Sequence, residues 1–135
     1  MSHELDDFFQ KNHLRLTQPR RQIFGALKSS STPMSIAEII KTNPSVDKVS
    51  VYRIIALFAR LHIVTTVTKG WRQSYELASP YAPHHHHLTC TDCGALTEVH
   101  SKKLESIILD LAGEYDFAPV GHHFELQGLC TLCRN

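Results

Sequence analysis

Hydrophobic residues recur every three or four positions through the first sixty residues, which predicts a series of amphipathic helices. A short helix is expected over residues 4–11. A second helix is expected to begin at Thr17, which would cap it, because Pro19 follows in the first turn and an apolar stripe comes next. This second helix ends at the serines of 29–31.

The next two helices are marked by a cap and by a continuous apolar face. Ser35 and Glu38 have the spacing of a capping box, so a helix is expected to start there and to stop before Pro44. The following helix is expected over residues 47–61. Its inward-facing residues are Val51, Ile54, Ile55, Phe58 and Leu61.

A β-hairpin is expected after these helices. Residues 63–68 are rich in β-branched side chains, Lys69-Gly70 supplies a turn, and residues 71–77 supply a second strand. Helices followed by a hairpin are typical of a winged helix-turn-helix domain, in which one helix enters the major groove of DNA.

The N-terminal end of the 47–61 helix is the candidate nucleic-acid surface. Ser50, Tyr52 and Arg53 lie on its outward face. Tyr52 can pack on a thymine methyl group, Arg53 can contact phosphate or guanine, and Arg15 can reach a flanking groove or the backbone. The alternative is a solvated helix face that carries one tyrosine and one arginine, and the helical pattern alone leaves it open.

Two prolines within residues 79–83 indicate a short, stiff linker between two domains. The sequence therefore predicts an α+β fold, with a winged-helix domain at 1–78 and a small α+β domain at 84–135, which the family resemblance described below implies to be an α/β dimerisation domain. The expected elements of the second domain are strands at 84–91, 95–99 and 120–126, a turn at Cys93-Gly94 and a helix at 101–115. So short a domain buries little core, so a structural metal and dimerisation would both stabilise it.

Composition and charge exclude several classes of protein. The 135 residues are 42% hydrophobic and 20% charged, as in globular proteins, and no apolar run is long enough to span a membrane. The acidic, polar N-terminus lacks the pattern of a signal peptide, so we expect a cytoplasmic protein.

The two halves of the chain differ in charge. Residues 1–78 carry 11 basic and 6 acidic residues (net +5), whereas residues 79–135 carry 3 basic and 7 acidic residues (net −4). This asymmetry suits nucleic acid in the first half and cations in the second.

Four cysteines form two Cys-x-x-Cys pairs, Cys90 with Cys93 and Cys130 with Cys133. Four thiolates together suit a closed, tetrahedral structural Zn²⁺ site. The alternatives are a thioredoxin-like redox pair, two disulfides or an iron–sulfur cluster. No βαβ pattern precedes either pair, and nothing indicates secretion, so we favour zinc.

Ten histidines are unusual, and four of them, residues 84–87, are consecutive. On a strand, alternate side chains point to opposite faces, so this one run can serve two metal sites. The first candidate site combines His84, His86, Glu105 and His122. The second combines Glu76, His85, His87 and Glu98, and it would span the linker. Nitrogen and carboxylate ligands suit Fe²⁺, Mn²⁺ or Zn²⁺, whereas the alternative is a set of surface histidines with His122 in the core.

Taken together, these motifs resemble those of the ferric uptake regulator family of bacterial metal-responsive repressors. The resemblance runs from Arg15-Leu-Thr-Gln-Pro-Arg20 through Ser50-Val-Tyr-Arg53 to Cys130-Thr-Leu-Cys133, and it is most specific between His84 and Gly94. It implies a homodimer that binds near-palindromic operator DNA when its sensing site is filled. It also implies a regulator of metal uptake rather than an enzyme, with no small organic substrate and no membrane association.

The resemblance also implies roles for particular residues. Tyr52 and Arg53 would lie on the recognition helix, with Arg15 as an accessory DNA contact. The four cysteines would hold structural zinc. The first histidine cluster would be a site within the dimerisation domain, and the second would be a hinge site that senses the metal.

Departures from the family pattern bear on the sensed metal. Iron-sensing members often have Asp where this chain has His86, and many supply a hinge-site histidine from a turn that here reads Thr32-Pro33-Met34. Ser79 stands where zinc-sensing members have a cysteine, and Glu98 stands where peroxide-sensing members favour Asp. The resemblance therefore leaves Fe²⁺ slightly ahead of Zn²⁺, with Mn²⁺ third.

Other classes of function leave part of the chain unexplained. A zinc hydrolase needs an open metal position and a general base, and the chain has no His-Glu-x-x-His motif. A metal-storage protein or metallochaperone would account for the histidines but not for the winged helix.

Overall fold

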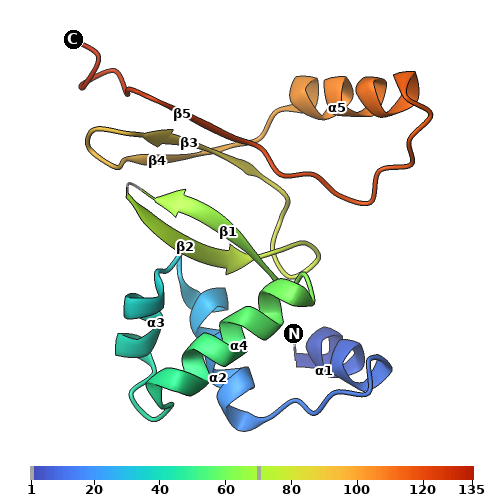
Figure 1. Ribbon diagram of the computed structural model, residues 1–135, viewed down its shortest axis with the longest axis vertical. Coiled ribbons are helices and arrows are strands. Elements are labelled where there is room, and N and C mark those ends of the chain that lie inside the picture. The colour runs from blue at the N-terminus through green and yellow to red at the C-terminus, as the bar shows by residue number, and fades with distance from the viewer. Residues whose placement is uncertain (1, 70) are drawn as a thin grey trace.

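A computed structural model describes residues 2–69 and 71–135 (Figure 1). Helices lie at one end of the molecule, a β-hairpin lies in the middle, and a second sheet with a further helix lies at the other end. The elements are α1 (Ser2–Lys11), α2 (Gln18–Ser29), α3 (Ile36–Thr42), α4 (Lys48–Arg60), β1 (Val64–Lys69), β2 (Arg72–Leu77), β3 (His86–Cys90), β4 (Leu96–Val99), α5 (Lys102–Glu114) and β5 (Glu125–Gly128). The expected α+β fold is confirmed. Among the described residues, no helix combines the length and the apolar character that crossing a bilayer requires.

Side-chain hydrogen bonds cap the starts of α3 and α4 but not the start of α2. At α3, the Glu38 amide donates to the Ser35 hydroxyl over 3.2 Å, and the Ser35 amide donates to the Glu38 carboxylate over 3.1 Å. At α4, the Ser50 amide donates to Asp47 over 3.0 Å. Thr17 occupies the N-cap position of α2, but its side chain makes no capping hydrogen bond. The expectation that Thr17 caps this helix is therefore wrong in chemistry, although right in position.

Replacing Ser35 with alanine is expected to destabilise the folded chain by about 1 kcal/mol, because the α3 N-terminus would lose its reciprocal cap. Thermal or urea unfolding measures this difference. The matched control is Ser31→Ala, which removes an exposed loop hydroxyl. Equal stability of the two variants would contradict the capping role.

The core of the molecule lies between α1, α2, α3, α4 and the hairpin. Phe9, Ile23 and Phe58 are completely or almost completely buried there, as the helical apolar pattern predicts. Tyr81, from the predicted 79–83 linker, is buried in the same cluster, and its ring packs edge-on against Phe24 with centroids 5.4 Å apart. The connection to the second sheet is therefore anchored to the core and is not a loose tether.

The wing is an antiparallel hairpin in which β1 and β2 pair along their full length. Val64 pairs with Leu77 and Lys69 with Arg72. Met34 and Tyr75 exchange both backbone hydrogen bonds, which attaches the segment before α3 to the far side of β2. The predicted Lys69-Gly70 turn falls partly outside the described residues, because Lys69 ends β1 and Gly70 is not described.

The second sheet has the order β4-β3-β5, with β3 antiparallel to β4 and parallel to β5. Two expected strand bounds are wrong. The strand expected at 84–91 covers only His86–Cys90, and the strand expected at 120–126 lies instead at Glu125–Gly128. The apolar residues before β5 lie outside the sheet as described, because β5 pairs with β3 only from Glu125 onwards.

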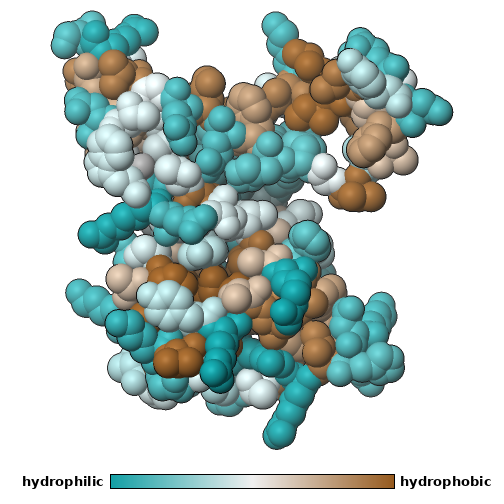
Figure 2. All heavy atoms as spheres, in the orientation of Figure 1, coloured by the Kyte–Doolittle hydropathy of each residue, from teal (hydrophilic) through white to brown (hydrophobic). Residues whose placement is uncertain are grey.

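This end of the molecule exposes much apolar surface. None of the residues of Lys102–Glu114 is buried, although the Ser101 side chain caps this helix by accepting from the Leu104 amide. Tyr115 is 76% exposed, Phe117 70% and Val120 fully exposed. Figure 2 shows apolar side chains gathered on the surface at the α5 end. The second sheet and α5 have too little buried apolar surface to be stable by hydrophobic packing alone.

Candidate metal centres and nucleic-acid interface

The four cysteines converge where the ends of β3 and β5 lie side by side. Cys90 ends β3 opposite Gly128 of β5, and Cys130 follows two residues after β5. Gly94, at a φ of 76° that favours glycine, turns the chain back after Cys93. All four sulfur atoms lie within 4.8 Å of one another, and Cys93 Sγ lies 3.8 Å from Cys130 Sγ. Tetrahedral Zn–S bonds of about 2.3 Å would place sulfur atoms about 3.8 Å apart, so the donor set fits zinc.

The thiols of this cluster differ in how easily they ionise. Backbone amides of Cys93 and Cys130 donate towards Cys90 Sγ and lower the pKa of the Cys90 thiol to about 6. Hydrogen bonding to the Cys130 side chain raises the pKa of Cys133 above its usual value. The Cys90 thiolate therefore forms easily, whereas Cys133 needs a cation beside it before it ionises.

The first histidine cluster surrounds one carboxylate. Glu105 lies in the first turn of α5, and its Oε1 lies 2.7 Å from His86 Nε2 and 3.1 Å from His84 Nε2. Its Oε2 lies 2.8 Å from His122 Nε2. His84 Nε2 and His122 Nε2 are only 3.0 Å apart, so the ring nitrogens converge on one small volume. Three imidazoles and one carboxylate suit a divalent transition metal.

Hydrogen bonds from these imidazoles, the one from His86 first, lower the pKa of Glu105 to about 2. A carboxyl whose pKa is lower in the folded state than its usual 4.5 stabilises the fold when it is ionised. That contribution is complete above about pH 4.5 and is lost as the pH falls towards 2.

The variant Glu105→Gln, cleared of loosely held metal, is expected to unfold at a lower temperature than the wild-type protein at pH 7. The difference should shrink between pH 4.5 and pH 2 as the wild-type carboxylate becomes protonated. Calorimetry across this range measures it, with Glu114→Gln, on an exposed position of the same helix, as the control. A difference that persists unchanged at pH 2 would contradict the ionised state of Glu105.

The second histidine cluster joins the wing to the second sheet. Glu76 of β2 places its Oε1 2.8 Å from His87 Nε2 and 3.0 Å from His85 Nε2. The Nδ1 of His85 lies 2.8 Å from the Pro83 carbonyl oxygen, which makes this nitrogen the protonated one and leaves Nε2 with a lone pair. His85 Nε2 is buried and makes no hydrogen bond despite its short distance to Glu76. A buried lone pair beside a carboxylate and a second imidazole fits a divalent cation.

Burial disfavours the charged form of His85, but the Pro83 carbonyl and Glu76 outweigh this effect and raise the pKa of His85. The Pro83 carbonyl oxygen and the Glu76 carboxylate thus both favour a positive charge beside them. The Pro83 carbonyl belongs to the backbone, and no side-chain pattern in the sequence could have indicated it.

Glu98 lies beside the second cluster and not within it. Its Oε1 is 2.9 Å from His100 Nε2 and 4.0 Å from His85 Nδ1, the nitrogen that faces Pro83. A cleft of about 250 Å³ separates Glu76, His85 and Glu98 from the segment around Thr32. The structure therefore brings together three of the four expected ligands and places the fourth at the rim. The His100 side chain holds Glu98 there.

The N-terminal end of α4 presents the expected nucleic-acid surface to solvent. Tyr52 is 52% exposed, and Arg53 and Arg15 are exposed as well. Ser50 is half-buried, and its hydroxyl donates to Asp47 over 2.6 Å, so it is engaged in the helix cap. The opposite face of α4 is buried in the core.

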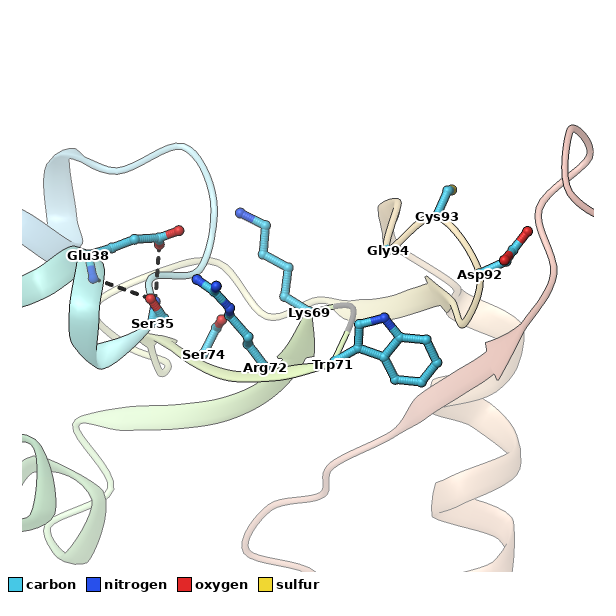
Figure 3. Close-up of a pocket in the computed structure, with 9 residues that line it drawn as sticks. All are labelled: Ser35, Glu38, Lys69, Trp71, Arg72, Ser74, Asp92, Cys93 and Gly94. Carbon is cyan, nitrogen blue, oxygen red and sulfur yellow. Dashed lines mark hydrogen bonds between the residues drawn. The ribbon is translucent and has the colours of Figure 1, made fainter.

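A second cleft, of about 300 Å³, lies between the wing, the start of α3 and the turn that carries Cys93 (Figure 3). Arg72 points towards Ser35 and Glu38, and the Trp71 indole lies on the side of Asp92 and Cys93. Trp71 is 84% exposed. Sequence reasoning assigned no role to this aromatic residue, which stands at the outer end of the wing.

Known proteins share similarity with nearly the whole of this chain. The model of the ferric uptake regulator family matches residues 11–127. The ferric uptake regulation protein of Campylobacter jejuni is 33% identical over 129 residues, which cover 90% of this chain and 81% of that protein. The ferric uptake regulator of Pseudomonas aeruginosa, solved with manganese, superposes with a TM-score of 0.80 at 25% identity, covering 93% of this chain and 97% of that one.

A third similar protein shares the fold. The ferric uptake regulator of Helicobacter pylori, described as having three functional metal-binding sites, superposes with a TM-score of 0.76 at 23% identity. The match covers 98% of this chain and 91% of that chain. The family match extends from the end of α1 into β5 and so includes the wing, both histidine clusters and one of the cysteine pairs. This chain therefore belongs to the ferric uptake regulator family of metal-responsive transcriptional regulators.

Proposed function

We propose that this protein is a metal-dependent DNA-binding repressor of genes for metal uptake or homeostasis, acting as a homodimer in the cytoplasm and without catalytic activity. One observation carries the proposal: the cluster of Glu76, His85 and His87 joins the wing of the DNA-binding part to the second sheet. A cation bound by these residues would fix the orientation of the two parts.

Zinc held by the four cysteines would be structural, because the cysteine cluster ties the end of β3 to the segment after β5. The sensing role falls to the Glu76 cluster, with Glu98 near enough to take part after a side-chain rotation. We propose Fe²⁺ as the sensed metal, ahead of Zn²⁺ and Mn²⁺. The site within the second sheet, formed by His84, His86, Glu105 and His122, would bind a further divalent metal.

A bound divalent cation supplies the positive charge that holds one carboxylate and two imidazoles together. Without it, Glu76 on the wing and His87 on β3 are held by one hydrogen bond of 2.8 Å. DNA binding requires one orientation of the recognition helices, so the residues that select this orientation control affinity. Linkage is reciprocal: the factor by which bound metal raises the affinity for DNA is also the factor by which bound DNA raises the affinity for metal.

Dimerisation is supported by the apolar surface around α5. Ile107 and Leu111 of α5 and Tyr115 directly after it are all more than half exposed, and none of the residues of α5 is buried. A second copy of the chain would cover this surface, and two recognition helices would then meet two half-sites of a palindromic operator.

The proposed function is tested by selecting duplexes from a random DNA pool with metal-loaded protein. Fluorescence anisotropy on the selected duplex then follows binding after chelation and after return of Fe²⁺ under anaerobic conditions, of Zn²⁺ or of Mn²⁺. We expect Fe²⁺ to restore tight binding at the lowest concentration, at a fixed salt concentration. Enrichment of no sequence with any of these metals would overturn the proposal and favour metal storage.

A further inference from the structure

Two side chains of the second sheet fasten the wing, and neither belongs to the three metal-ligand clusters. The Thr68 amide donates to Glu125 Oε1 over 2.8 Å. The Thr89 hydroxyl donates to the Thr68 carbonyl oxygen over 3.0 Å. Thr89 is 3% exposed, and the Glu125 side chain is 16% exposed. We call this pair of contacts at Thr68 the wing clasp.

The wing clasp occupies the free edge of β1. In an antiparallel hairpin, alternate residues direct their amide and carbonyl groups towards the partner strand or away from it. Both backbone groups of Thr68 point to the second sheet, so those of its neighbour Val67 point to β2. A strand edge of this kind normally bonds water or another strand. Here a carboxylate and a hydroxyl from two different strands satisfy it, and the carboxylate makes the stronger, charge-assisted bond.

The position of the wing clasp relates it to both histidine clusters. Thr89 lies two residues after His87 on β3, so both side chains point to the same face, towards the wing. Glu125 pairs with His87 across the β3–β5 register. Glu125 also follows three residues after His122, the ligand that the loop before β5 contributes to the first histidine cluster. The segment 122–125 therefore runs from one candidate metal site to the wing.

We propose that Glu125 and Thr89 are positioning residues for metal-dependent DNA binding. This inference rests on the proposed function and extends it. The wing clasp holds β1 against the second sheet at the outer part of the wing, whereas the Glu76 cluster holds β2 nearer the linker. Two separated points of attachment resist rotation of the wing, which a single point would allow. The orientation of the recognition helix then follows that of the second sheet.

The first test measures the contact itself, without DNA. Amide hydrogen exchange in the zinc-loaded full chain is followed by NMR at Thr68 and, as an internal reference, at Val67. In Glu125→Ala, exchange at Thr68 should accelerate at least tenfold while exchange at Val67 stays unchanged. Glu125→Gln, which keeps an acceptor oxygen, should retain most of the protection, as should Gln127→Ala, an exposed control on the same strand. Equal protection of Thr68 in Glu125→Ala would overturn the proposal.

The second test measures the consequence for DNA binding. With Mn²⁺ as the metal, Glu125→Ala should weaken binding to the selected duplex about tenfold, as expected for loss of a hydrogen bond to a charged group. Thr89→Val should act in the same direction, and Thr89→Ser should restore binding. Binding without Mn²⁺ should change less, so the stimulation by metal falls. If Glu125→Ala lost the same factor of affinity with and without Mn²⁺, so that the stimulation by metal stayed at the wild-type value, the positioning role would be overturned. Wild-type protein that binds no DNA with any metal would refute the proposed function instead, while the exchange result at Thr68 would still decide whether the wing clasp exists.

Discussion

Replacing Cys90 with serine is expected to remove the tightly held zinc and to unfold the second sheet. The physical reason is that this part of the chain has almost no hydrophobic core: Cys90 itself is buried, while every residue of α5 keeps contact with solvent. Structural zinc in small domains contributes about 10–16 kcal/mol of apparent binding free energy at neutral pH. That amount exceeds what so small a set of buried residues supplies.

Elemental analysis of purified wild-type protein should give one zinc per chain that survives mild chelation, and Cys90→Ser should give none. Circular dichroism and sedimentation should then show lost structure and lost dimers. The matched control is Thr131→Ser, which changes an exposed residue inside the second Cys-x-x-Cys pair but leaves all four thiols. A folded, dimeric Cys90→Ser protein would count against the structural role of this site.

Replacing His87 with alanine is expected to abolish metal-dependent DNA binding while leaving the fold and the cysteine-bound zinc intact. His87 is 4% exposed and contributes one of the three ligand atoms that join the wing to β3. Loss of an outer partner of a ligand typically costs a site 10- to 100-fold in affinity, so loss of the ligand itself should cost more than about 100-fold. The free energy that couples metal to DNA is lost with it.

The measurement is anisotropy of the selected duplex during titration with Mn²⁺, together with the zinc content and thermal midpoint of each protein. His3→Ala is the control, because it removes an exposed histidine of α1 that belongs to none of the three clusters. We expect His3→Ala to behave as the wild type. Metal-dependent DNA binding that survives in a folded His87→Ala protein would show that the sensing site lies elsewhere.

The metal-ligand clusters could be predicted from the sequence because their signals are local. Alternation along a strand separates His84 and His86 from His85 and His87, and the structure directs the two pairs to different carboxylates. The Cys-x-x-Cys spacing similarly brings two sulfurs together within one turn. Glu105 could be paired with the histidines because the helix expected at 101–115 places it in the first turn, as the structure does.

Features that depend on contacts distant in sequence could not be predicted in this way. Residues 120–126 look like a strand, yet parallel pairing of β5 with β3 begins only at Glu125, and no local pattern encodes a parallel register. Glu98 was a reasonable ligand by position, but His100 competes for its carboxylate. The contact of Glu125 with Thr68 joins residues 57 positions apart, and neither residue type indicates in the sequence that they meet.

The four consecutive histidines have one further consequence, for insertions and deletions. In most half-buried strands, a slip by one residue moves every side chain to the wrong face. Within a run of identical residues, the same slip still offers an imidazole to each face, so the run itself cannot define its own alignment. That alignment comes from the residues that follow it, with Thr89 bonded to Thr68 and Cys90 opposite Gly128. Gain of one histidine in this run should therefore change mainly the length of the connection from Pro83, whereas loss of one would also remove the imidazole that His84 offers to the first cluster.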